Sequence, residues 1–284
     1  MRIYITGGSG LLGQALRREL NDEEVVAPPR SGADITDSAG LIRHVTDCAP
    51  DAVIHCAAAT AVDWCESHAD EAYCLNALGS ANVANACRRC GCRLIAISTD
   101  YVFDGTLPRP YHEFDRATGG RTVYGQSKFA GEEAIRRLCP DHLICRTAWL
   151  YGPDGPNFAR TILQRLHTGN GQPLRVVSDQ FGNPTSTAAL ASHLRLLLRR
   201  PELTGTFHLS CEGEASWYEF ACFIARHSGL ATPRILPCTT AEFPRPAPRP
   251  ANSRLEKRML RLCGLPPMPH WHEALADFLS REHG

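Results

Sequence analysis

Short apolar runs alternate with longer stretches of helical periodicity in the first half of the chain. Runs rich in β-branched residues predict strands at residues 2–6, 25–27, 52–56, 93–98 and 142–147. Between them, apolar side chains that recur every three or four positions predict helices at residues 10–20, 39–49, 71–90 and 124–138. Strands that alternate with helices need right-handed crossovers, which produce a mainly parallel sheet with helices on both faces. The pattern therefore predicts an α/β fold with a doubly wound parallel sheet of the Rossmann type.

The rhythm changes after residue 151, where proline and glycine become frequent. Residues 243–250 have the sequence FPRPAPRP, which is too rich in proline for regular secondary structure, and we expect an extended segment there. With its two arginines, this segment is either a linker or a loop that closes over an anionic ligand. We expect the doubly wound domain to comprise residues 1–151 with a returning segment near 187–230. Residues 152–186 and 231–284 are expected to form a smaller C-terminal α+β substrate lobe.

Composition excludes several classes of protein. Hydrophobic residues make up 43% of the 284 residues and charged residues 21%, as in ordinary globular proteins. Thirty basic residues balance thirty acidic ones, so no net charge draws the chain to nucleic acid or to an anionic membrane. No apolar run approaches the roughly 20 residues that span a bilayer, and the amino terminus has no signal-peptide layout. We expect a soluble protein of the cytoplasm.

Thirteen cysteines invite a disulfide or a metal interpretation. A chain without a secretion signal usually keeps its cysteines reduced, as small buried apolar residues. Cys87, Cys90 and Cys92 form the one tight cluster, a C-x-x-C-x-C run without a second well-spaced pair. This spacing is weak evidence for zinc, and we predict no metal site.

A glycine-rich turn follows the first predicted strand directly and precedes a helix. Its sequence, TGGSGLLG from residue 6 to residue 13, fits G-x-x-G-x-x-G through Gly7, Gly10 and Gly13. Such glycines permit a tight turn and let the backbone approach a pyrophosphate, which then faces the amino terminus of the helix. Between a strand and a helix, the motif predicts a bound dinucleotide.

The end of the second predicted strand bears on which nicotinamide cofactor is bound. Sites that prefer NAD usually carry an acidic residue there, which holds the ribose 2′-hydroxyl. Here the stretch is VAPPRS, without a carboxylate, and Arg30 could bind a 2′-phosphate. The alternative is that Arg30 is a solvated loop cation. The sequence favours NADPH and leaves NADH open.

Two further segments carry candidate chemistry. Thr99 follows a buried strand, and Tyr124 and Lys128 are four residues apart on one face of a predicted helix. Tyrosine ordinarily titrates near pH 10, and an ammonium group nearby is expected to bring its pKa toward neutrality. Tyr124 could then protonate the alkoxide that forms when a ketone is reduced, while the hydroxyl of Thr99 hydrogen-bonds the same oxygen.

The chain resembles the extended short-chain dehydrogenase/reductases and, within them, the dTDP-4-dehydrorhamnose reductases. The matching blocks extend over nearly the whole chain and include, besides Tyr124 and Lys128, residues 57–63, 75–77, 98–103, 146–152, 157–159, 178–185 and 249–255. The blocks at 178–185 and 249–255 are more particular than the general cofactor motifs.

This resemblance implies NADPH-dependent reduction of the 4-keto group of dTDP-6-deoxy-L-lyxo-4-hexulose to dTDP-L-rhamnose. The first domain would bind NADP and the lobe the nucleotide sugar. Tyr124 would be the proton donor, and Lys128 its electrostatic partner and a ligand of the cofactor ribose. Thr99, Asp100 and Trp149 would contact the sugar. The cofactor contacts of the family map onto Gly10, Leu11, Leu12, Asp34, Ile35, Ala58, Ala59 and Thr60.

Other residues have ordinary interpretations beside functional ones. Asn252 and Arg254 suit a sugar diphosphate, although Arg254 could equally be solvated. His55 and His208 lie in apolar runs and are expected to be core histidines.

Two other functions stay open: a reductase or epimerase of another nucleotide sugar, and a non-catalytic NADP-binding regulatory subunit of the methionine adenosyltransferase type. The complete set of Thr99, Tyr124 and Lys128 favours an enzyme. A homodimer is also left open.

Overall fold

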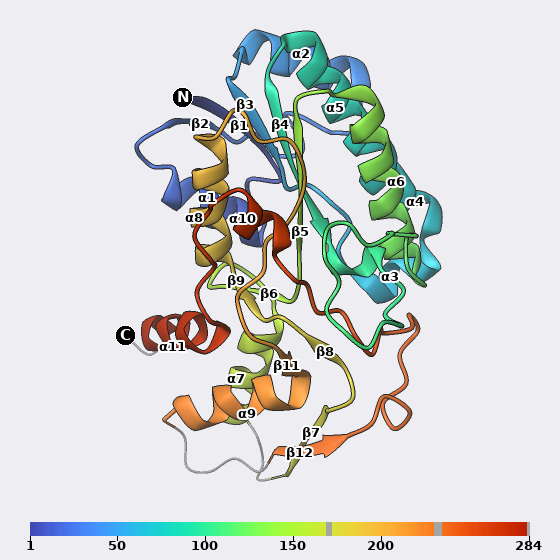
Figure 1. The fold of residues 1–284 in the computed structure, drawn as a ribbon, viewed down its shortest axis with the longest axis vertical. Helices are drawn as coiled ribbons and strands as arrows, with labels where there is room; N and C mark the ends of the chain where they lie inside the picture. The colour runs from blue at the N-terminus through green and yellow to red at the C-terminus, as the bar shows by residue number, and fades with distance from the viewer. Residues whose placement is uncertain (169–171, 230–234, 283–284) are drawn as a thin grey trace.

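A six-stranded parallel sheet forms the centre of the larger part of the molecule (Figure 1). The computed structural model describes residues 1–168, 172–229 and 235–282. The strand order is β10–β5–β4–β3–β1–β2, and every neighbouring pair is parallel. The strands are β1 (Arg2–Thr6), β2 (Glu24–Val26), β3 (Ala52–His55), β4 (Arg93–Thr99), β5 (His142–Thr147) and β10 (Gly205–His208). From β1 the chain builds the sheet outward first in one direction, to β2, and then in the other, to β3, β4, β5 and β10. Ligands of such sheets bind beside the carboxyl ends of the strands where the direction changes.

Helices cover both faces of the sheet, as the alternating pattern predicted. One face packs against α1 (Leu11–Glu19) and α8 (Thr187–Leu198), and the other against α2 (Ser38–Cys48), α5 (Gly79–Cys90) and α6 (Val123–Leu138). Successive side chains of a strand point to opposite faces. Ile3 and Ile5 accordingly belong to the core on the α1 face, and Tyr4 to the core on the α5 face. The predicted fold class is confirmed.

The helix expected at residues 71–90 is helical throughout but is not one regular helix. It consists of α4 (Ala69–Tyr73), a π-helical turn at Cys74–Leu78, and α5. A short helix that the sequence pattern did not predict, α3 (Val62–Ser67), precedes it. A π-helical turn accommodates an additional residue within a helix and often marks a functional site.

A smaller lobe lies below the sheet in Figure 1 and contains α7 (Phe158–Thr168) and α9 (Trp217–His227). Its short strands pair as β6 (Leu150–Tyr151) with β9 (Thr185–Ser186), β7 (Leu174–Val177) with β12 (Ile235–Cys238), and β8 (Phe181–Gly182) with β11 (Ala215–Ser216). The remaining helices are α10 (Arg258–Leu262) and α11 (Trp271–Glu282). The apolar core of the lobe is continuous with the core on the α1 face of the sheet.

The boundaries between the two parts remain a proposal. Within the expected returning segment, α8 packs on α1 and β10 joins the large sheet. The last helix of that segment, α9, instead packs against α7 of the lobe. The boundary at residue 231 lies outside the described residues. Residues 243–250, expected to be extended, contain neither helix nor strand.

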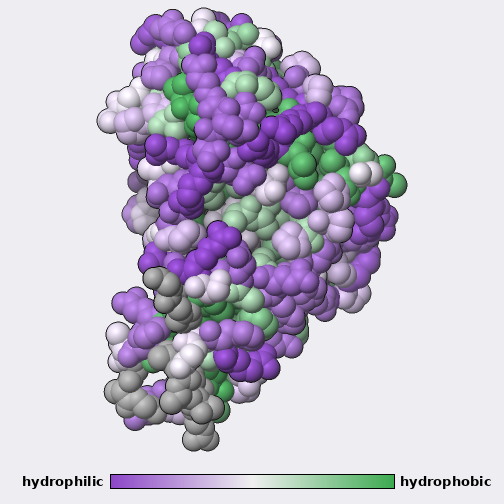
Figure 2. All heavy atoms as spheres, turned by 90° about the vertical axis from the view of Figure 1, so that its left-hand side faces the viewer, coloured by the Kyte–Doolittle hydropathy of each residue, from purple (hydrophilic) through white to green (hydrophobic). Residues whose placement is uncertain are grey.

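None of the described helices is both long enough and apolar enough to cross a membrane. Figure 2 shows a largely hydrophilic face on which hydrophobic side chains form separate areas. All thirteen cysteines, every one within the described ranges, are free thiols. Those ranges contain no group of three or more His, Cys, Asp or Glu side chains placed to hold a metal ion.

Candidate active site

One cavity of about 620 Å³ extends along the carboxyl edge of the sheet, between the glycine-rich turn and the smaller lobe. Its volume is within the range of sites for small molecules. Most of the residues singled out from the sequence line it: Gly7, Gly10, Leu11, Leu12, Gly13, Arg30, Asp34, Ile35, Ala58, Thr60, Thr99, Asp100, Tyr124, Lys128 and Trp149. Ala59, Asn252 and Arg254 are not among the described lining residues.

The glycine-rich turn lies tightly against the end of β3. Gly7 has a φ of +70°, and a β-carbon there would come within 2.7 Å of the backbone nitrogen of Ala57. A β-carbon on Gly13 would come within 2.3 Å of the carbonyl oxygen of Gly7. Only glycine fits both positions, and α1 begins directly after Gly10, at the cavity wall. A pyrophosphate can therefore approach backbone and a helix amino terminus, so these residues fit a dinucleotide.

Arg30 and Asp34 lie at the edge of the same cavity and form a loose ion pair. Arg30 Nε is 3.3 Å from Asp34 Oδ2, and the Arg30 side chain is 72% exposed. Asp34 Oδ1 also accepts hydrogen bonds of 2.8 Å from the amide and the hydroxyl of Thr36, which hold the pKa of Asp34 below its usual value. An exposed ion pair contributes little free energy. Arg30 can therefore exchange Asp34 for a ligand phosphate at small cost.

Tyr124 stands at the start of α6, where the helix is fixed by its cap. The hydroxyl of Thr122 accepts a 3.0 Å hydrogen bond from the amide of Gly125. Burial raises the pKa of Tyr124 above the ordinary value of 10, and the hydroxyl of Thr99 acts in the opposite direction. The expected lowering of this pKa toward neutrality by the Lys128 ammonium is not what the structure gives, because burial is the largest influence. The phenol is thus protonated at neutral pH.

Lys128 is buried one helical turn further along α6. Its Nζ donates a 2.8 Å hydrogen bond to the carbonyl oxygen of Ile97, at the end of β4. Burial lowers the pKa of Lys128 to about 8, and the negative charge of Glu132 opposes that shift. Glu132 is itself held by Arg146, whose Nε and Nη2 lie 2.9 and 2.7 Å from its two carboxylate oxygens. A positive charge therefore remains on Lys128 at neutral pH.

Thr99 and Asp100 bring polar groups to the end of β4. The Thr99 hydroxyl donates a 2.9 Å hydrogen bond to Asp100 Oδ1. Asp100 is only 3% exposed, and burial raises its pKa to about 6 against the hydrogen bonds from Ser253 and Thr99. Both residues line the cavity together with Tyr124.

Asn76 is a residue of this region whose role the sequence pattern did not identify. It belongs to the π-helical turn, is fully buried, and contacts both backbone polar groups of Ala59. It also donates a 3.0 Å hydrogen bond to the hydroxyl of Ser127, on α6. Asn76 thereby joins the loop at the end of β3 to the helix that carries Tyr124.

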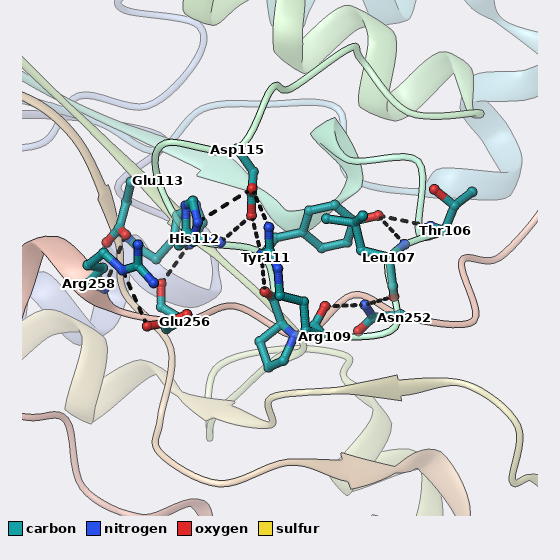
Figure 3. A network of polar contacts seen from close by, with 12 residues as sticks. Thr106, Leu107, Arg109, Tyr111, His112, Glu113, Asp115, Asn252, Glu256 and Arg258 are labelled. Carbon is teal, nitrogen blue, oxygen red and sulfur yellow. Dashed lines mark hydrogen bonds and ion pairs between the residues drawn. The ribbon is translucent and has the colours of Figure 1, made fainter.

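Asn252 and Arg254 hold protein segments together, and Figure 3 shows the contacts of Asn252. Asn252 Nδ2 donates to the carbonyl oxygens of Leu107 and Arg109, at 2.6 and 2.8 Å. Arg254 forms an ion pair with Glu214 and donates to the carbonyl oxygen of Pro108. Their predicted contact with substrate stays a prediction.

The two histidines behave as the core residues that the sequence predicted. His55 Nδ1 is 2.7 Å from the Thr6 hydroxyl, and its Nε2 is 3.1 Å from the Ser80 hydroxyl. His208 Nδ1 lies 3.0 Å from the carbonyl oxygen of Glu256. Burial lowers the pKa of each to about 3, so both are neutral at physiological pH.

The lining also contains residues that the motifs did not identify, among them Pro156 and Trp217. Trp217 directly follows Ser216, and Glu219 stands three residues beyond that serine, which is the capping-box pattern of a helix start. That signal locates a helix terminus but does not indicate which site the terminus approaches.

Comparison with known proteins identifies a family. The family model described as the RmlD substrate binding domain matches residues 1–283. The spore coat polysaccharide biosynthesis protein SpsK of Bacillus subtilis is 42% identical over 98% of this chain and 97% of its own length. A dTDP-4-dehydrorhamnose reductase of Mycobacterium tuberculosis is 41% identical over 98% of this chain and 92% of its own. A dTDP-4-dehydrorhamnose reductase of Bacillus anthracis, solved in complex with NADP, superposes with a TM-score of 0.95 at 39% identity and covers 99% of both chains.

Proposed function

This chain belongs to the dTDP-4-dehydrorhamnose reductase family, and from that premise we infer that it is an NADPH-dependent oxidoreductase of nucleotide sugars. The reaction is reduction of the 4-keto group of dTDP-6-deoxy-L-lyxo-4-hexulose to dTDP-L-rhamnose. The observation that carries this assignment is that Thr99, Tyr124 and Lys128 line the same cavity as the glycine-rich turn. A ketone held there meets a hydroxyl, a phenol and an ammonium group beside the dinucleotide site.

The residues that would hold the cofactor line the same cavity. We propose that the turn from Gly7 to Gly13 receives the pyrophosphate, and that Arg30 receives the 2′-phosphate of NADPH. Ala58, Thr60 and Lys128 would contact the remainder of the molecule. When bound, NADPH supplies the hydride that reduces the ketone. NADH, which lacks the 2′-phosphate, would use the same glycine-rich turn without the contact to Arg30.

Tyr124 acts as the proton donor in this proposal. Its pKa is raised by burial, so the phenol carries its proton at neutral pH and can give it to the sugar oxygen as negative charge develops there. The Thr99 hydroxyl stabilises the same oxygen by a hydrogen bond, once it turns from Asp100. Lys128, positively charged and buried, stabilises the phenolate that Tyr124 leaves.

Location and assembly are separate proposals. We propose that the enzyme works in the cytoplasm, where nucleotide sugars and reduced nicotinamide cofactors are made. We also propose that a homodimer forms in solution. Light scattering after size exclusion tests the dimer.

The decisive experiment follows NADPH oxidation with the 4-keto-6-deoxy sugar nucleotide, prepared enzymatically from dTDP-glucose. Tyr124→Phe should bind cofactor normally and lose about 10²- to 10⁴-fold in rate, the usual contribution of a general acid. Tyr73→Phe, which changes an exposed tyrosine, is the matched control. An unchanged rate in Tyr124→Phe would refute the mechanism. Sugar interconversion without net NADPH consumption would instead indicate an epimerase, and cofactor binding without turnover a regulatory protein.

A further inference from the structure

Two tryptophans from distant parts of the chain stack face to face at the cavity wall. The rings of Trp149 and Trp217 have centroids 3.5 Å apart and an interplanar angle of 6°. Both line the cavity that contains Tyr124 and Thr99. Trp149 follows β5 of the large sheet, and Trp217 is the first residue of α9 in the lobe. The stack therefore connects the two parts of the molecule at the site itself.

The backbone of Trp149 is held in a costly conformation. Its φ is +48°, in the left-handed region that residues with a β-carbon rarely adopt. Its indole lies against Gly182, where an added β-carbon would come within 2.4 Å of the ring. A large side chain in such a strained position persists only where its surroundings fix it. Gly182 and Trp217 provide that fixation.

Trp217 is itself firmly placed. The amide of Ser216 donates a 2.7 Å hydrogen bond to the Glu219 carboxylate, and the amide of Glu219 donates a 3.1 Å hydrogen bond to the Ser216 hydroxyl. Phe158 packs on Trp217 with ring centroids 4.5 Å apart. This arrangement fixes the indole before any ligand arrives, so little conformational entropy is lost when a ligand binds.

The stacked pair offers an apolar, polarizable wall of fixed shape. Such a wall does not suit a diphosphate, but it suits the carbon-bound hydrogens and the methyl group of a deoxygenated hexose. We propose that Trp217 is a specificity-determining residue: it holds the Trp149 indole in place, and the pair receives the apolar side of the 6-deoxy sugar. This inference rests on the proposed function and identifies what the enzyme recognises in the sugar. Trp217 is a positioning residue, because it acts through Trp149.

The test separates binding of the sugar from binding of the nucleotide. The protein, loaded with NADP, is titrated calorimetrically with dTDP-L-rhamnose and with dTDP. Trp217→Leu should weaken binding of dTDP-L-rhamnose by about tenfold, the scale of one aromatic contact, and leave dTDP within about twofold. Trp217→Phe, which retains a ring, should recover most of the loss. Trp64→Phe, an exposed tryptophan outside the cavity lining, is the control and should match the wild type.

Two further readouts guard against a merely structural effect. Near-ultraviolet circular dichroism reports the packing of the indoles, and both Trp217 variants should change this signal while keeping the far-ultraviolet signal. Should Trp217→Leu fail to fold, Gly182→Ala displaces the Trp149 indole instead and should give the same sugar-selective loss. In the NADPH-oxidation assay, these variants should raise KM for the sugar nucleotide more than they lower kcat.

The outcomes are distinguishable. Equal weakening of dTDP and dTDP-L-rhamnose would mean that the wall serves the base, which overturns the proposal, and so would unchanged binding of both. If the wild-type protein neither binds dTDP-L-rhamnose nor oxidises NADPH with the 4-keto sugar, the proposed function itself is wrong. An active wild type with unaffected Trp217 variants would refute only the role of the stack.

Discussion

Asn76 and the backbone of Ala59 exchange two hydrogen bonds. The amide of Ala59 donates to Asn76 Oδ1 at 2.8 Å, and Asn76 Nδ2 donates to the carbonyl oxygen of Ala59 at 3.1 Å. The second hydrogen of the same side-chain amide binds the Ser127 hydroxyl at 3.0 Å. The side-chain amide of Asn76 pairs with the N–H and the C=O of Ala59 in the way that the backbone of a neighbouring strand would. It also links the cofactor loop to α6, the helix that carries Tyr124.

Asn76→Ala should impair both stability and catalysis. The substitution removes the hydrogen bonds of Asn76 to two buried backbone groups of Ala59, whose carbonyl oxygen keeps a weak contact of 4.0 Å with Cys65 Sγ. Each lost hydrogen bond should cost about 1–3 kcal/mol in the free energy of unfolding. The loop and α6 would also lose their link, so we expect kcat to fall on the order of tenfold or more. Urea unfolding and NADPH oxidation measure the two effects.

Asn85→Ala is the matched control for this change. Asn85 lies on α5 and is partly exposed, and within the described part of the chain its side chain makes one weak contact, of 3.5 Å with Arg88. Its loss should change the free energy of unfolding by less than about 0.5 kcal/mol and leave the rate unchanged. If Asn76→Ala changed the free energy of unfolding and the rate as little as Asn85→Ala, the link between the cofactor loop and α6 would not contribute to catalysis.

The sequence predicted the doubly wound fold because its signals are local. In β1, buried Ile3, Tyr4 and Ile5 form an apolar run that fits a strand covered on both faces, and the glycine-rich turn follows at once. The π-helical turn at Cys74–Leu78 escaped prediction, since one additional residue hardly disturbs helical periodicity. The strands of the lobe, several only two residues long, show no period from which they could be predicted.

The site was predictable where one motif locates a residue and unpredictable where two distant segments meet. The glycine spacing and the Tyr124–Lys128 pair identify residues that line one cavity. Nothing in the sequence near Trp149 indicates that Trp217 stacks on it, because that contact depends on how the lobe packs against the sheet. Asn252 shows the converse: the residue type fits a sugar diphosphate, yet its amide hydrogens bind the carbonyl oxygens of Leu107 and Arg109.

Arg30→Ala should change the preference between cofactors. If Arg30 binds the 2′-phosphate, its removal costs one charge-assisted contact, roughly 1.5–3 kcal/mol, or about ten- to hundredfold in KM for NADPH. KM for NADH should stay within about twofold, because NADH has no 2′-phosphate. Initial rates with both cofactors measure this, with Arg43→Ala on the exposed side of α2 as control. An equal rise in both KM values would assign Arg30 to another part of the dinucleotide.

The rate should fall on the alkaline side as Lys128 loses its proton. Burial lowers the pKa of Lys128 to about 8, so its positive charge is complete well below pH 8 and disappears above it. Because the charge stabilises the phenolate of Tyr124, kcat/KM for the sugar nucleotide should decrease about tenfold per pH unit above that value. Lys128→Arg, which stays charged throughout, should show no such limb near pH 8. A wild-type profile that is flat to pH 9.5 would contradict this role of Lys128.

His55 should make the folded protein sensitive to mild acid. Its pKa is about 3 in the folded state, because burial disfavours the charged ring, and about 6.5 in an unfolded chain. The unfolded state therefore binds the proton first, and the stability that the neutral histidine contributes is complete above pH 6.5. It is lost as the pH falls from about 6.5 toward 3, by up to about 1.4 kcal/mol per pH unit. The lowered pKa of His208 also makes the folded state less stable as the pH falls. The pKa of Asp100, raised to about 6, has the opposite effect on stability.

The contribution of His55 is isolated by comparing urea unfolding of the wild type and His55→Gln at pH 7.5 and pH 5.5. The free energy of unfolding of the wild type should decrease by about 1.4 kcal/mol more than that of the variant over this interval. Parallel pH dependence in the two proteins would mean that His55 takes up a proton without unfolding, which its contacts with Thr6 and Ser80 in a fully buried site should not allow.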